Sequence, residues 1–282
     1  MSPEIPRDYS LRKRLWDDLT RLGMPVWDYE GAHTSIERQR VVFQEMGDLI
    51  GKPSLEAIRY LWKRFSDFVD IAAVAGCFYY YDRERDKKEY IQKEAAVAFP
   101  LEVALDLKKL SWQWIDDQRN RLAKEWGLEP VSFGITNVIY SSIDWQLANS
   151  SPLPHGGLSE CWFGDPRSLL ENTKFIAFAD IDKKMPDEQI LQISKELGTP
   201  FLVADTARGH HLLFPLIFGE RRKTNVCTRI GLVLGFGWEE HRYLWHVLER
   251  GVATIRVTPG LRREETPKIS ALVWDENIIV RE

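Results

Sequence analysis

An apolar segment that ends in two acids constrains the fold of this chain more than any other feature. It reads Phe-Ile-Ala-Phe-Ala-Asp-Ile-Asp and runs from Phe175 to Asp182. Successive side chains of a strand point to opposite faces, so Asp180 and Asp182 are predicted to share one face of a sheet while Ile181 points into the core. Two carboxylates on one face make a site for a divalent cation, and oxygen ligands of this kind suit Mg²⁺ or Mn²⁺.

A glycine turn with two imidazoles follows about one helix and one strand later. The segment from Thr206 to Pro215 reads Thr-Ala-Arg-Gly-His-His-Leu-Leu-Phe-Pro. If a strand leaves the turn here, His210 and His211 point to opposite sides of it. We expect Asp205, at the end of the preceding strand, to cap the turn.

Composition limits the classes of protein to which the chain can belong. Its 282 residues, of which 44% are hydrophobic, can bury the core of one large or two modest domains. A net charge of -4 argues against binding nucleic acid through bulk charge, so any such binding must use local patches. The cysteines Cys77, Cys161 and Cys227 lie far apart, which predicts neither a zinc cluster nor a disulfide framework and favours a reducing, cytoplasmic setting.

Membrane segments and export signals are not expected. No run reaches the roughly 20 apolar residues that span a bilayer. The first residues are charged and contain Pro3 and Pro6, unlike a signal peptide. We therefore expect a soluble protein without a membrane partner.

Residue patterns predict a helical N-terminal domain at 1–128 and an α/β (α+β) core at 129–282. In the first part, apolar residues repeat at helical spacing, whereas strand and helix patterns alternate in the second. The predicted helices lie at 8–22, 35–50, 55–69 with Ser54 as N-cap, 91–98, 101–126, 187–197, 223–234 and 238–250. The predicted strands lie at 131–141, 174–181, 200–205, 211–218, 253–258 and 269–274.

The two chemical motifs together resemble the first two motifs of the archaeo-eukaryotic primase superfamily, which contains the small-subunit primases and the primase-polymerases. The resemblance rests on Phe-Ala-Asp-Ile-Asp-Lys-Lys and on Thr-Ala-Arg-Gly-His-His-Leu-Leu-Phe-Pro, and it covers about residues 130–282. It implies a catalytic core with an RRM-like sheet, preceded here by an accessory helical domain of a plasmid- or virus-type protein. It also implies a metal-dependent nucleotidyltransferase that makes or extends primers on a single-stranded DNA template from nucleoside triphosphates, with a helicase or a primase large subunit as further partner.

The same resemblance implies roles for individual residues. Asp180 and Asp182 would bind Mg²⁺ or Mn²⁺, and His211 would contact the phosphates of the incoming nucleotide. Gly209 would be the turn glycine, and Arg208 beside it a phosphate or template contact. The later segment Thr-Ile-Arg-Val-Thr-Pro-Gly, which contains Arg256, resembles the strand and turn that follow the third motif of the family.

The third acid of the family has no regular counterpart. Residues 242–246 read Arg-Tyr-Leu-Trp-His, where the family places an acid. We rank Glu240 above Glu249 and Glu239 as its substitute. In a two-metal site these carboxylates hold the cations that activate a 3′-hydroxyl and steady the leaving pyrophosphate.

Two other functions fit parts of the pattern. One is a catalytically inactive primase-like subunit that binds template or partner proteins and has lost the third acid. The other is a rolling-circle replication initiator or relaxase, which needs two histidines separated by one hydrophobic residue and a tyrosine nucleophile. The adjacent His210 and His211 fit that arrangement poorly. An isolated Asp-x-Asp can also be an ordinary turn, so its pairing with the histidine motif carries the metal-site prediction.

Overall fold

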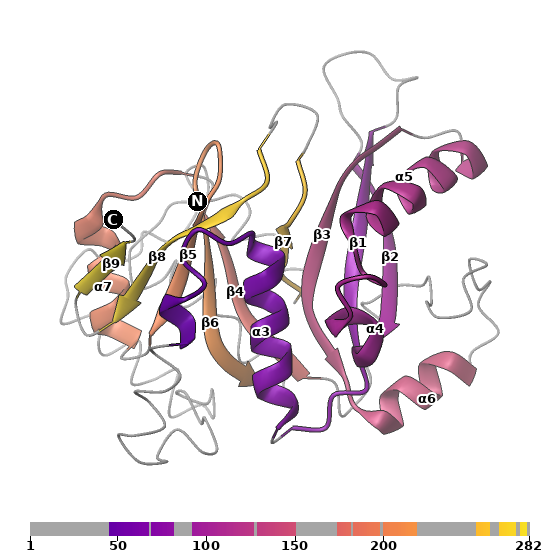
Figure 1. Ribbon diagram of the computed structural model, residues 1–282, viewed down its shortest axis with the longest axis horizontal. Coiled ribbons are helices and arrows are strands. Elements are labelled where there is room, and N and C mark those ends of the chain that lie inside the picture. Colours follow the sequence, from indigo (N-terminus) through magenta and orange to yellow (C-terminus); the bar gives the residue numbers. More distant parts are fainter. Residues whose placement is uncertain are drawn as a thin grey trace, which may run out of the picture. The chain divides into compact units, whose positions relative to one another are not determined.

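The computed structural model describes ten stretches of the chain, shown as coloured ribbon in Figure 1. Within them no helix is long and apolar enough to cross a membrane. The described residues are 45–67, 69–81, 92–126, 129–150, 174–181, 183–197, 200–218, 252–259, 265–274 and 277–280.

The chain divides into two compact units, each assembled from segments that are distant in sequence. The first unit takes its described residues from 1–57, 174–253 and 268–282, and the second from 58–173 and 254–267. This division differs from the expected boundary between 128 and 129, because a strand that follows this boundary pairs with one that precedes it.

The first unit contains an antiparallel sheet with strand order β4-β6-β5-β8-β9. The helix α7 (Asp187–Leu197) contacts β8 and β9 of this sheet (Figure 1). The strands are β4 (Lys174–Ile181), β5 (Phe201–Asp205), β6 (His210–Phe218), β8 (Lys268–Trp274) and β9 (Asn277–Val280).

Local patterns explain the elements of the first unit. The middle of β4 is buried throughout, as a strand covered on both faces requires. In α7, Ile190 and Ile193 are buried one turn apart, while the acids Asp187 and Glu188 occupy the first turn, where the helix dipole favours negative charge. The sequence prediction of β4 and α7 is confirmed.

A short N-terminal segment also belongs to the first unit. Gly51 has a φ of 85°, a conformation that glycine adopts without steric cost. Its N–H donates to the carbonyl of Ile269, and the N–H of Ile269 donates to the carbonyl of Lys52. The residues that follow the helical turn at 45–50 therefore attach the chain to β8 before α3 (Ser54–Ser66) begins.

The second unit contains an antiparallel sheet with strand order β2-β1-β3, and β7 pairs with β3. Helices α4 and α5 contact this sheet, and α6 contacts β3. These elements are β1 (Ala73–Tyr81), β2 (Gln92–Pro100), α4 (Leu101–Leu105), α5 (Trp112–Trp126), β3 (Glu129–Tyr140), α6 (Ser142–Ser150) and β7 (Thr254–Arg256).

Aromatic packing against glycine forms the core of the second unit. The ring of Phe133 lies so close to Gly76 that a Cβ there would stand 2.5 Å from its Cζ atom. On its other sides, Phe133 packs at 4.6 Å from Phe78 and at 6.5 Å from Trp114 of α5, measured between ring centroids. Gly76 thus gives Phe133 the room to link the sheet to the helix.

The prediction of a helical domain over 1–128 is wrong for the described residues, because 73–81 and 92–100 form the paired strands β1 and β2. The alanine-rich stretch Ala95–Ala98 favours a helix by intrinsic propensity, but strand pairing with β1 overrides that preference. The predicted helix 101–126 is also interrupted. The side chain of Asp106 accepts hydrogen bonds from the backbone N–H groups of Lys108 and Lys109, and this turn separates α4 from α5.

The remaining strand and helix predictions agree with the structure where it describes them. The strands β3, β5, β6, β7 and β8 lie within a few residues of their predicted bounds, and α3 begins at the predicted Ser54. The predicted helices at 8–22, 223–234 and 238–250 lie outside the described residues, as does most of 35–50. The described chain is an α+β protein built on antiparallel sheet.

Candidate active site

Asp180 and His211 face each other on neighbouring strands of the first unit. They are directly paired across β4 and β6, and the Nε2 atom of His211 lies 3.6 Å from the Oδ1 atom of Asp180. The imidazole is completely buried, whereas 18% of the Asp180 side chain is exposed. The fold therefore brings the acid motif and the histidine motif together on one face of the sheet, with the carboxylate open to solvent.

The turn between β5 and β6 sets this register. The backbone N–H of Thr206 donates to the carbonyl of Gly209 at 3.1 Å, and the N–H of Gly209 donates to the Thr206 hydroxyl at 2.9 Å. We expected Asp205 to cap this turn, but the hydroxyl of Thr206 does so. The side chain of Arg208 is exposed at the turn.

His210 contacts a different acid, as expected for a residue next to His211 in a strand. It pairs across the sheet with Asp205 of β5, and its Nδ1 atom lies 3.0 Å from the Oδ1 atom of Asp205, without the alignment of a good hydrogen bond. The Nζ atom of Lys184 lies 2.8 Å from the same carboxylate oxygen. Asp205 therefore bridges a buried imidazole and an exposed ammonium group.

The surroundings of His210 disfavour the charged form of its imidazole. Burial lowers its pKa below the ordinary value, and the positive charge of Lys184 lowers it further. The carboxylate of Asp205 and the backbone of Met185 oppose this shift only in part. The charged pair in this cluster is consequently the one between Lys184 and Asp205.

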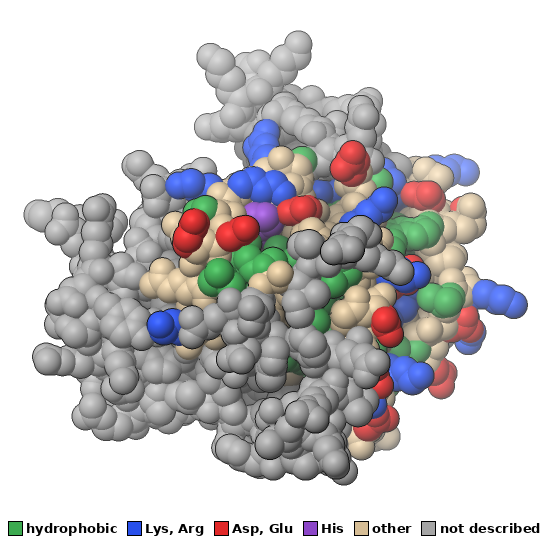
Figure 2. All heavy atoms as spheres, turned by 60° about the vertical axis from the view of Figure 1, so that its left-hand side comes forward, with side chains coloured by type: hydrophobic (Ala, Val, Ile, Leu, Met, Phe, Trp, Pro, Cys, Tyr) green, Lys and Arg blue, Asp and Glu red, His purple; other side chains and the backbone are tan. Residues whose placement is uncertain are grey.

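Charged side chains of both signs gather around a histidine at the surface. Figure 2 shows this histidine with aspartate or glutamate and lysine or arginine side chains close to it, and with apolar side chains alongside. Among the described residues, Lys184, Asp205 and His210 form such a mixture of charged side chains around an imidazole. Such a mixture supplies oxygen ligands for a cation and basic groups for an anion within a short distance.

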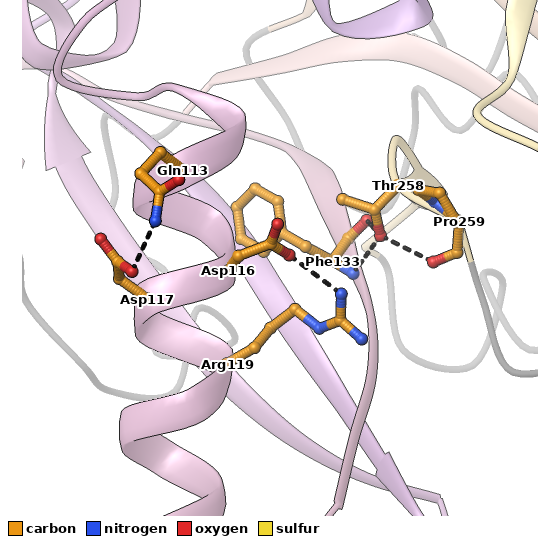
Figure 3. A network of polar contacts seen from close by, with 7 residues as sticks. All are labelled: Gln113, Asp116, Asp117, Arg119, Phe133, Thr258 and Pro259. Carbon is orange, nitrogen blue, oxygen red and sulfur yellow. Dashed lines mark hydrogen bonds and ion pairs between the residues drawn. The ribbon is translucent and has the colours of Figure 1, made fainter.

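Arg256 lies in the second unit, at the end of β7. Its side chain is 9% exposed, and its Nη1 atom donates to the backbone carbonyls of Thr258 and Glu265. The hydroxyl of Thr258 accepts a hydrogen bond from the N–H of Phe133 at 2.8 Å, as Figure 3 shows beside the polar side chains of α5. In this structure the guanidinium group therefore supports the segment that follows β7.

The other predicted site residues lie outside the described residues. These are Asp182 and the candidates for the third acid, Glu239, Glu240 and Glu249. In the described part of the chain, no group of three or more histidine, cysteine, aspartate or glutamate residues could hold a metal ion. The partly exposed carboxylate of Asp180 at the end of a strand nevertheless fits a hard cation that keeps water and phosphate ligands.

Sequence reasoning missed the role of Lys184 and gave Asp205 a different one. A signal was available for the second residue. A four-residue turn at 206–209 places Asp205 opposite His210 as soon as both flanking segments are taken as strands. Lys184 gives no such signal, because its contact depends on the direction of the chain after β4.

Comparisons of the chain with protein-family models, with curated proteins and with solved structures found no significant match.

Proposed function

We propose that this chain is a metal-dependent nucleotidyltransferase of the primase type, which makes or extends primers on a single-stranded DNA template from nucleoside triphosphates. The observation that carries the proposal is the cross-strand pair of Asp180 and His211, with 3.6 Å between the carboxylate and the imidazole. Two sequence motifs separated by a helix and a strand thus come together on one sheet face. The antiparallel α+β architecture of the first unit supports the same interpretation.

In the proposed reaction, Asp180 and Asp182 hold Mg²⁺ or Mn²⁺, with Glu240 as the candidate third ligand. Bound cations of this kind activate a hydroxyl nucleophile and neutralise charge on the leaving pyrophosphate. The side chains of this chain bind and orient the reactants, which is the main contribution of protein to phosphoryl and nucleotidyl transfer. Arg208, exposed at the turn, supplies a positive charge for the triphosphate or the template.

His211 has a more specific role in this arrangement. Its buried imidazole lies beside the carboxylate of Asp180 and restrains the orientation of that group. A nucleotide phosphate can reach the imidazole only when the side chains that cover it move. We therefore assign His211 first to the positioning of Asp180 and second to nucleotide contact on substrate binding.

A primer-synthesis assay tests the proposal. Purified protein is incubated with single-stranded DNA, ribonucleotides or deoxynucleotides, and Mg²⁺ or Mn²⁺. The double variant Asp180→Ala with Asp182→Ala should fold and lose incorporation, because clustered carboxylates contribute mainly repulsion when no cation is bound. Asp187→Ala, which removes an exposed acid of α7 in the same unit, is the matched control and should retain activity. Incorporation by the folded double variant would overturn the proposal.

The alternatives give different results in the same assay. An inactive primase-like subunit would bind single-stranded DNA and incorporate no nucleotide under any of these conditions. A relaxase would form a covalent adduct between a tyrosine and DNA. Either result would replace the proposed activity.

A further inference from the structure

A second cluster lies on the sheet face opposite the Asp180–His211 pair. Neighbouring residues of a strand point to opposite faces, so His210 lies on the far side of β6 from His211. There it meets Asp205, and Asp205 meets Lys184. We call these three residues the far-face cluster.

The far-face cluster connects three segments that carry the proposed catalytic motifs. Lys184 belongs to the connection between β4 and α7, two residues after Asp182. Asp205 ends β5, immediately before the turn that contains Arg208 and Gly209. His210 begins β6 and is followed directly by His211. A single carboxylate therefore links the chain after the acid motif to both ends of the turn.

The register of the sheet fixes the end of β4 independently. Ile181, which precedes Asp182, is completely buried and pairs with His210 across the sheet. On the other side, Met185 is 6% exposed, and the Lys184 ammonium lies 2.8 Å from Asp205. The described chain is thus held by strand pairing at Ile181 and by the contact of Lys184 with Asp205 three residues later.

Stability alone does not explain the pair of Lys184 and Asp205. The side chains of Lys184 and Asp205 are 49% and 51% exposed, and ion pairs of such exposure contribute little to folding. Their effect should be local, because they restrict the direction that the chain takes when it leaves β4.

We propose that Lys184, Asp205 and His210 are positioning residues that hold the β4–α7 connection against the β5–β6 turn and thereby set the spacing between the proposed metal ligands and His211. This inference rests on the proposed function. It adds to that function a set of residues on the opposite face that touch neither metal nor nucleotide.

Direct binding of Mn²⁺ tests the inference on the full chain. Lys184→Ala should raise the dissociation constant of Mn²⁺ several-fold, up to about tenfold, which is the lower end of the effect of outer-shell partners on metal affinity. Lys183→Ala removes the same charge one residue earlier from an exposed position and is the matched control. Lys184→Arg keeps the ion pair and should restore the affinity. Thermal midpoints of these variants should agree closely, since the pair is exposed.

Hydrogen exchange provides a second measurement that does not depend on metal binding. Backbone amides at 183–185 and 206–209 should exchange faster in Lys184→Ala than in Lys183→Ala. Equal Mn²⁺ affinity in Lys184→Ala and in the unaltered protein would overturn the inference and leave the proposed function standing. If the unaltered protein binds no Mn²⁺, the proposed function fails, and so does the assignment to a metal site. In that case faster exchange in Lys184→Ala alone would still support the anchoring of the connection, and equal exchange would overturn it.

Discussion

The two adjacent histidines of β6 allow the effects of burial and of chemistry to be separated. His211 is completely buried and His210 is 7% exposed. Replacing either with alanine removes an imidazole of the same size from the same strand. By analogy with other large-to-small substitutions, we expect both His210→Ala and His211→Ala to lower the free energy of unfolding by about 2–4 kcal/mol.

Neither substitution should leave an uncompensated buried charge, which would add to the loss of stability in only one of the two variants. Without His211, the carboxylate of Asp180 keeps its access to water, because 18% of its side chain is exposed. Without His210, the carboxylate of Asp205 keeps the ammonium of Lys184 at 2.8 Å. The two losses of stability should therefore be similar.

Activity should separate the two variants. His211→Ala removes the direct partner of a proposed metal ligand and should lower incorporation roughly 100-fold, at the upper end of the range for such partners. His210→Ala disturbs only the far-face cluster and should lower incorporation at most about tenfold, which corresponds to about 1.4 kcal/mol.

The assay compares incorporation with stability under the same conditions. Unfolding is followed by urea titration, and incorporation is measured well below the unfolding midpoint at several Mn²⁺ and nucleotide concentrations. A loss that excess Mn²⁺ reverses assigns His211 to Asp180, whereas one that excess nucleotide reverses assigns it to the phosphates. Equal losses of activity in the two variants, or a larger loss in His210→Ala, would refute the assignment of His211.

Two further predictions concern stability. Gly76→Ala should lower the free energy of unfolding by about 1–3 kcal/mol in a urea titration, because its Cβ would stand 2.5 Å from Phe133. Gly47→Ala, whose Cβ would meet nothing within 4 Å, should not. The lowered pKa of His210 means that the folded state binds fewer protons than the unfolded state at mildly acidic pH. The free energy of unfolding should therefore be fully retained above pH 6.5 and should decrease as the pH falls through this value. His210→Gln should flatten that decline, and an unchanged pH profile would contradict the assignment.

Local patterns predicted the elements around the candidate site, because these elements are defined by their own residues. The buried run of β4 and the amphipathic pattern of α7 need no knowledge of their neighbours. The strand β2 was missed because its alanines adopt a strand only when β1 lies beside them. A scale of intrinsic helix propensity takes no account of that long-range contact.

The same distinction applies to the site residues. From the sequence, Asp180 and His211 could be assigned to one site, because the resemblance to a known family involves both motifs. The Lys184–Asp205 pair could not be predicted from the sequence, because it depends on the direction taken by the chain after β4 and on the register of the β5–β6 turn. The roles of Asp182 and Glu240 stay predictions.

The attachment of Gly51 to Ile269 has a consequence for the order of folding during synthesis. These hydrogen-bonded residues lie near opposite ends of the sequence, and β5 likewise pairs with the late strand β8. The hairpin of β1 and β2 can form while the chain is still on the ribosome, whereas the sheet that holds Asp180 is complete only after Lys268–Trp274 has been made and has paired with β5. Closing such distant contacts is slow, so newly made chains should pass through a state in which β5 is an open edge available to chaperones or to aggregation.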